Sequence, residues 1–98
     1  MPLTSAAARS LRALAHHLEP VVQLGKNGLT DAIAAAVEDA IEHHELVKVR
    51  LATESPADRD ESAEELARAL KAEVAQVLGR TILLYRRHPS EPKINLPK

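Results

Sequence analysis

The chain has 98 residues, a hydrophobic fraction of 45% and no cysteine, so we expect one small globular domain (1–98) in a reducing cytoplasm, without disulfides or thiolate metal sites. The net charge of −1 is unevenly spread: residues 54–65 hold one arginine against six acidic residues (−5), and residues 66–98 hold seven Lys/Arg against two glutamates (+5). No apolar run approaches the roughly 18 residues of a membrane span, so no membrane partner is expected.

The first part of the chain predicts a helix followed by a short strand. An apolar repeat at helical spacing predicts a helix over residues 5–18, which Thr4 or Ser5 can cap and Pro20 closes. The repeat consists of Leu11, Leu14, Ala15 and Leu18. Residues 21–24, three of which are apolar, then predict a short buried strand.

A second helix and a second strand follow. Thr30 suits a helix N-cap, and an apolar residue at every fourth position predicts a helix to about His44. That repeat is Ile33, Val37 and Ile41. Residues 46–51 alternate between apolar side chains and the cations Lys48 and Arg50, which predicts a half-exposed strand with both cations on one face.

The third helix is marked by its opening residues. Ser55 can act as N-cap and Pro56 suits the first helical position, so we predict a helix from there to about Lys71. Its acidic residues fit a solvated helix face. A docking face for a basic partner is the alternative.

The remaining chain predicts a hairpin and a tail. Two apolar runs, 74–78 and 81–86, flank Gly79 and Arg80, which fit a type II′ turn. Residues 88–98 are polar and rich in proline, as expected for a C-terminal tail. The predicted order α-β-α-β-α-β-β implies an α/β fold of the α+β sandwich type, with a four-stranded mixed sheet covered by helices.

The loop before the second helix offers the most specific chemistry. Two glycines flank a cation and an amide there, in the order Gly25, Lys26, Asn27 and Gly28. Glycines let a phosphate approach the backbone, and a helix N-terminus presents free N–H groups with a positive dipole end. A plain turn is the alternative for so short a motif.

Other site chemistries find little support in the sequence. No serine or threonine lies in a nucleophile-elbow pattern, so we expect no enzyme, no small-molecule substrate and no cofactor. In each of the histidine pairs 16–17 and 43–44, the two neighbours point to different faces of a helix, which does not suit binding of one metal ion. Both pairs lie near predicted helix C-termini, where the helix dipole favours histidine.

The basic residues favour binding to a phosphate backbone. Lys48 and Arg50 share a strand face, Arg80 lies at the hairpin turn and Arg86 ends the last strand, although a solvated sheet face is the alternative for the first two. A single tyrosine cannot form a base-stacking platform, zinc-finger ligands are missing, and the alanine-rich, acidic second helix does not suit a DNA major groove. Backbone recognition through a GxxG loop remains.

Segments along most of the chain resemble, in the right order, the CRM domain in its stand-alone bacterial form, the YhbY family. The matching segments are 11–16 (LRALAH), 20–30 (PVVQLGKNGLT), 40–49 (AIEHHELVKV), 77–80 (VLGR), 83–86 (LLYR) and 93–98 (KINLPK). The resemblance implies an RNA-binding domain similar to the C-terminal domain of translation initiation factor three. It implies association with precursors of the large ribosomal subunit, and RNA contact through the GxxG loop at residues 25–28.

Two hypotheses for function follow. In the first, the loop and Thr30 at the start of the second helix hold the backbone of rRNA, and Lys48, Arg50, Arg80 and Arg86 extend the contact. The protein would then be a cytoplasmic factor in ribosome biogenesis. In the second, the acidic third helix docks a basic ribosomal protein. Clustering of the cations beside the loop would favour RNA, whereas scattering would favour the protein partner.

Overall fold

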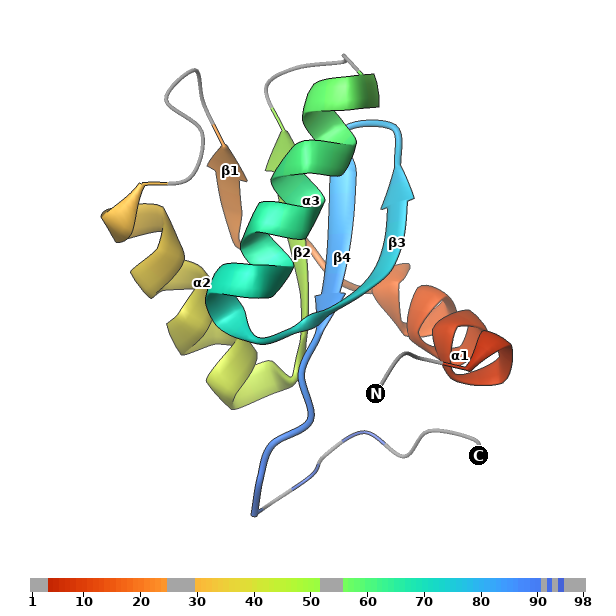
Figure 1. Cartoon of the computed structure of the whole chain (residues 1–98). Coiled ribbons are helices and arrows are strands. Elements are labelled where there is room, and N and C mark those ends of the chain that lie inside the picture. Colours follow the sequence, from red (N-terminus) through yellow and green to blue (C-terminus); the bar gives the residue numbers. More distant parts are fainter. Residues whose placement is uncertain (1–3, 25–29, 52–55, 91, 93, 95–98) are drawn as a thin grey trace.

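The computed structural model describes residues 4–24, 30–51, 56–90, 92 and 94. The elements follow the predicted order along the chain (Figure 1). They are α1 (Ser5–Ala15), β1 (Val22–Leu24), α2 (Asp31–His44), β2 (Leu46–Leu51), α3 (Pro56–Leu70), β3 (Glu73–Leu78) and β4 (Thr81–Tyr85).

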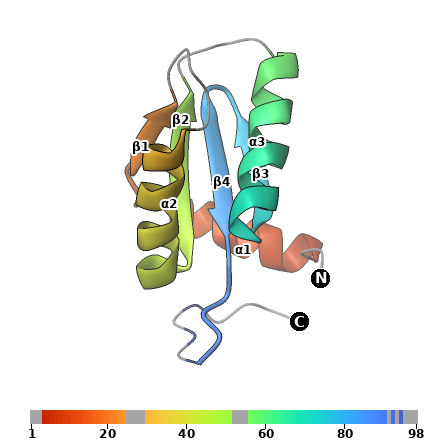
Figure 2. The same ribbon diagram turned by 60° about the vertical axis from the view of Figure 1, so that its left-hand side comes forward.

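The four strands form one mixed sheet, as predicted, and the structure gives their order in it as β1-β2-β4-β3. β1 pairs with β2 in parallel, and the two remaining pairs are antiparallel. Helices α2 and α3 lie over one face of the sheet, whereas α1 crosses the opposite face near the end where β4 leaves the sheet (Figures 1 and 2).

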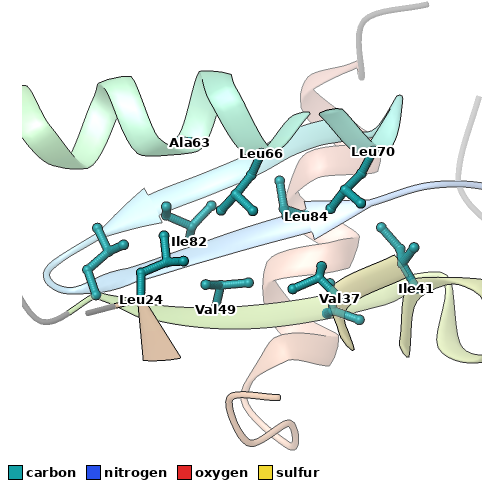
Figure 3. Packing of buried hydrophobic residues seen from close by; sticks show 11 residues of the cluster. Leu24, Val37, Ile41, Val49, Ala63, Leu66, Leu70, Ile82 and Leu84 are labelled. Atoms are coloured by element: carbon teal, nitrogen blue, oxygen red, sulfur yellow. The ribbon is translucent and has the colours of Figure 1, made fainter. Parts of the chain in front are cut away.

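The larger part of the core fills the space between the sheet and helices α2 and α3 (Figure 3). Alternate residues of β2 and β4 point into it, because successive side chains of a strand face opposite sides. Its central members are Val37, Ile41, Leu66, Leu70, Val49, Ile82 and Leu84. Burial of each large aliphatic side chain contributes about 1.5–3 kcal/mol to the free energy of folding. Close packing of aliphatic side chains therefore stabilises this core without aromatic rings.

A second cluster lies beneath α1 on the other face of the sheet. Leu11 and Ala15 of the helix pack against Leu46, Leu83 and Tyr85 of β2 and β4. The other alternating side chains of these strands supply this cluster, so β2 and β4 are covered on both faces there. This burial explains why β2 is less exposed than its alternating sequence predicted.

Helix α1 differs from its prediction in length and in one core residue. Thr4 caps it as expected, with its hydroxyl accepting a hydrogen bond from the Ala7 N–H at 3.0 Å. The helix ends at Ala15 instead of residue 18, and tighter turns follow. Leu14, predicted to be in the core, is 42% exposed, because α1 contacts the sheet along a narrow stripe that contains Leu11 and Ala15.

The chain reverses sharply between α2 and β2 at Glu45. This residue has φ +64°, a conformation that costs a side-chain-bearing residue roughly 1–3 kcal/mol. Its side chain is fully buried, and its carboxylate accepts hydrogen bonds from the N–H groups of His88 at 2.7 Å and Ile94 at 2.8 Å. The described part of the predicted polar tail is therefore docked on the fold.

Candidate functional site

The ends of the junction between β1 and α2 follow the prediction, but the predicted burial of residues 21–24 holds only in part. Val21 is 41% exposed and Gln23 is exposed, because β1 lies at the edge of the sheet. Leu24 at the end of β1 is buried in the larger core, and Thr30 is the N-cap of α2. The Thr30 hydroxyl accepts a hydrogen bond from the Ile33 N–H at 3.2 Å. The predicted phosphate loop, residues 25–28, lies outside the described residues, so its geometry stays a prediction.

The structure gives the two cations of β2 different surroundings. Lys48 and Arg50 lie on the α1 side of the sheet, as their spacing predicted, and Arg50 is exposed. The Lys48 ammonium group donates hydrogen bonds to the carbonyl oxygens of Ala15 at 2.8 Å and Leu18 at 3.1 Å. It thereby satisfies carbonyl groups at the C-terminal end of α1, which is a structural role.

Arg86, the last cation of the predicted set, is engaged on the other side of the sheet. Its guanidinium group donates hydrogen bonds to Glu38 at 2.7 Å, to Glu42 at 3.2 Å and to the Leu70 carbonyl oxygen at 2.8 Å. The side chain is only 22% exposed. Arg86 therefore joins α2 to the end of α3, at the opposite end of the sheet from the β3–β4 turn.

The β3–β4 turn places Arg80 beside the end of β2. Gly79 has φ +59° while Arg80 does not have a positive φ, the combination expected in a type II′ turn. The Leu51 N–H donates a hydrogen bond to the Arg80 carbonyl oxygen at 2.6 Å. Arg50 pairs with Gln23 in the β1–β2 register, so Arg50 lies beside the strand that leads into the predicted loop. Arg80 lies at the same end of the sheet, on the far side of β2 from that strand.

The predicted cations therefore divide into two sets. Arg50 and Arg80 lie at the sheet end that carries the β1–α2 junction, whereas Lys48 bonds to the end of α1 and Arg86 to the end of α3. Clustering is thus partial. Sequence spacing could place Lys48 on the correct face, but it could not show that the end of α1 would meet its ammonium group.

Charge separates the two faces of the sheet. Helix α1 carries the exposed Arg9 and Arg12 and no acidic residue. The opposite face carries exposed acidic side chains on α2 and α3, which are Asp31, Asp39, Glu42, Asp60, Glu61, Glu64 and Glu65. A polyanion is therefore repelled less on the α1 face than on the face of α2 and α3.

A groove that no sequence pattern predicted lies between α1 and the open part of the sheet. It has a volume of about 280 Å³, and its lining includes Arg12 and His16 of α1 and Leu78 of β3. The helical spacing of Arg12 and His16 was the available signal for one wall of the groove. No pattern indicated that Leu78 would be exposed.

Three further observations concern the chemistry of the described residues. Among them, no group of three or more His, Asp or Glu side chains could hold a metal ion. The described helices include none with the length and apolar character needed to cross a bilayer. Burial raises the pKa of Tyr85 above its usual value, Glu45 raises it further and Arg87 lowers it, but this phenol belongs to the cluster beneath α1.

Comparison with known proteins gives a consistent result. The model of the CRS1/YhbY (CRM) domain matches residues 3–86. An "RNA-binding protein" of Haemophilus influenzae is 42% identical over 98% of this chain and 96% of its own length. The "Probable RNA-binding protein YqeI" of Bacillus subtilis is 36% identical over 97% of this chain and 99% of its own.

A solved structure supports the same fold. The solution structure of a hypothetical protein from Staphylococcus aureus, SAV1595, superimposes with a TM-score of 0.85 at 37% identity. The match covers 97% of this chain and 99% of the other. The arrangement of three helices around a four-stranded sheet is therefore shared with an experimentally determined structure.

Proposed function

The chain belongs to the CRS1/YhbY (CRM) domain family, and from this premise we propose that it binds the phosphate backbone of RNA through residues 25–28 and the sheet end beside them. The observation that carries the proposal is that Arg50, which pairs with β1, and Arg80, which bonds to the end of β2, lie at the same end of the sheet as the junction between β1 and α2. The N–H groups and the dipole of a helix start favour phosphate, and arginine can bind it through two parallel hydrogen bonds.

The RNA that we propose is rRNA, bound in the cytoplasm while the large ribosomal subunit assembles. The relatives named as RNA-binding proteins support the polymer class, and the resemblance to the YhbY family supports the assembly role. Binding alone suffices for such a role, so the proposal includes no catalysed reaction and no cofactor.

Charge reversal at the proposed contact tests the role of the loop. Lys26→Glu and Arg50→Glu place negative charge where we expect phosphate, and Arg68→Glu on the exposed surface of α3 is the matched control. The affinity for fragments of large-subunit rRNA is measured by fluorescence anisotropy at fixed salt. We expect the first two variants to bind at least tenfold more weakly, a change of about 1.4 kcal/mol, and the control to bind as the wild type does. Equal affinity of all four proteins would refute the proposed contact.

A second candidate function rests on the acidic surface of α3. Glu61, Glu64 and Glu65 are all exposed and present a surface that could dock a basic ribosomal protein. Glu64→Lys combined with Glu65→Lys would then reduce binding to purified precursors of the large subunit without weakening binding to naked rRNA. If RNA affinity accounts for all association with these particles, this candidate is excluded.

A further inference from the structure

The groove between α1 and the sheet lies on the outer face of the sheet, opposite α2 and α3. Both ribbon views show α1 crossing this face at one end only, away from the β3–β4 turn (Figures 1 and 2). The second core cluster lies under the helix at that end, where Leu11 and Ala15 meet Leu46 and Tyr85. The groove begins where this contact stops.

The floor of the groove is apolar and its sides carry hydrogen-bonding groups. Leu83 is buried at the base, and Leu78 is 66% exposed, an unusual position for a large aliphatic side chain. Gln76 and Thr81, both half-buried, line the same space and provide an amide and a hydroxyl. The groove therefore combines an apolar surface with a few polar groups, as ligand sites commonly do.

The charged residues that line the groove favour an anionic ligand. Arg12 and His16 lie one helical turn apart on α1 and line the groove, and none of its lining residues is acidic. The inner wall includes Lys48, whose ammonium group is held by the carbonyl groups of α1. A second groove between α2 and α3 contains Glu38 beside Arg86, and the surrounding surface is acidic. Of these two grooves, the one beside α1 suits an anionic ligand better.

We propose that the groove beside α1 receives one unpaired nucleotide of the bound RNA. This inference rests on the proposed function, because it presumes that RNA reaches the sheet end at Arg50. The base lies against Leu78, Gln76 and Thr81 contact its edge, and Arg12 contacts a flanking phosphate. A volume of about 280 Å³ is just below the roughly 300–1,000 Å³ of small-ligand sites, so it suits one base.

The geometry favours an unpaired base over a paired one. A base within a duplex is stacked on both faces, so it cannot lay a face on Leu78 without leaving the helix. Arg50 is a residue of β2 that is exposed on the same face of the sheet as the groove, and it lies beside the end of β1. RNA held at the β1–α2 junction could therefore continue over the basic α1 face toward the groove.

Two hairpin RNAs of equal length test the inference, one with a fully paired stem and one with a single unpaired purine in the stem. A fluorescent purine analogue at the unpaired position reports on its surroundings. We expect the wild type to bind the bulged RNA about tenfold more tightly and to change the analogue's emission. Leu78→Ser should abolish both effects while leaving the affinity for the paired hairpin unchanged, because Leu78 is exposed and its loss does not open the core.

The controls separate this inference from the proposed function. Leu14→Ser removes an exposed leucine of α1 that does not line the groove, and it should retain the preference for the bulged RNA. Arg12→Gln should weaken binding of the bulged hairpin more than Arg68→Gln, which changes the same charge on the other face. Equal binding of both hairpins by the wild type, or an unchanged preference in Leu78→Ser, would overturn the proposal that the groove binds an unpaired nucleotide. Failure to bind either hairpin would overturn the proposed function as well.

Discussion

The buried carboxylate of Glu45 accepts a hydrogen bond from the backbone N–H of His88 across 2.7 Å. The same carboxylate accepts from the Ile94 N–H, and the Glu45 carbonyl oxygen accepts from the Arg86 N–H at 2.8 Å. One residue at the end of α2 therefore fixes the path of the chain after β4. The sequence alone predicted residues 88–98 as a polar tail, without a contact to the rest of the fold.

Removing this carboxylate should release the chain after β4. We expect Glu45→Ala to lower the free energy of unfolding by about 1–3 kcal/mol, because two hydrogen bonds to a buried carboxylate are lost. Urea denaturation measures the change. Faster proteolysis after residue 87 and loss of amide protection at Ile94 would accompany it.

Substitution of Glu45 by glycine distinguishes the effect of losing the carboxylate from the effect of the backbone conformation on stability. Both Glu45→Gly and Glu45→Ala lack the carboxylate, but only glycine tolerates φ +64° without a steric cost. We therefore expect Glu45→Gly to be more stable than Glu45→Ala by about 1 kcal/mol, although glycine normally destabilises a chain. The reverse order would mean that the backbone at this position stores no strain.

The ammonium group of Lys48 should stabilise the docking of α1. Lys48→Met keeps most of the aliphatic stem but loses the hydrogen bonds to Ala15 and Leu18, so we expect a loss of about 1–2 kcal/mol in urea denaturation. Arg50→Met is the control on the same face, and its exposed side chain should change stability little. Equal effects of the two substitutions would contradict the structural role of Lys48.

Tyr85 should ionise at a higher pH in the folded chain than in the unfolded chain. Burial is the main cause of its raised pKa and Glu45 adds to it, whereas Arg87 opposes it. The folded chain therefore holds the phenol proton more tightly. Tyr85 leaves the stability unchanged below pH 10.0, and stability falls as the pH rises through the folded-state pKa.

The chain contains a single tyrosine, so tyrosinate absorbance follows this group alone. We expect a titration midpoint above 10.0 in buffer and a return toward that value in concentrated urea. Glu45→Gln should lower the midpoint and Arg87→Gln should raise it. A midpoint that is the same in buffer and in urea would show that the phenol is not buried.

Arg86 should contribute to stability more than to RNA affinity. Arg86→Met loses the hydrogen bond to the Leu70 carbonyl oxygen and two bonds to half-exposed glutamates, which solvent screens. We expect about 1–2 kcal/mol lower stability and unchanged binding to rRNA fragments at a temperature where the variant is folded. Arg87→Met is the exposed control. Weaker RNA binding with unchanged stability would return Arg86 to the set of RNA contacts.

Local sequence signals predicted the elements and their caps well. Thr4, Thr30 and Pro56 mark helix starts because their chemistry acts within one turn of the chain. The alternation of Lys48 and Arg50 likewise follows from the geometry of one strand. For the same reason, Gly79 identified the turn between β3 and β4.

Contacts between distant segments could not be predicted in this way. The exposure of Leu14 depends on how α1 crosses the sheet, and the role of Lys48 depends on where that helix ends. The role of Glu45 requires the chain after β4 to return to α2, which no local pattern encodes. Candidate site residues were therefore predicted by type and face, but not by the partners that engage Lys48 and Arg86.

The position of α1 has a consequence for the order of events during synthesis. Helix α1 leaves the ribosome well before several of its packing partners, which are Ala75, Leu83, Tyr85 and Ile94. These partners are made after β2 and α3, so the cluster beneath α1 can close fully only after residue 94 has emerged. Until then, only Leu46 and its neighbours in β2 are available to the apolar stripe of α1, whereas β1, α2 and β2 already have one another.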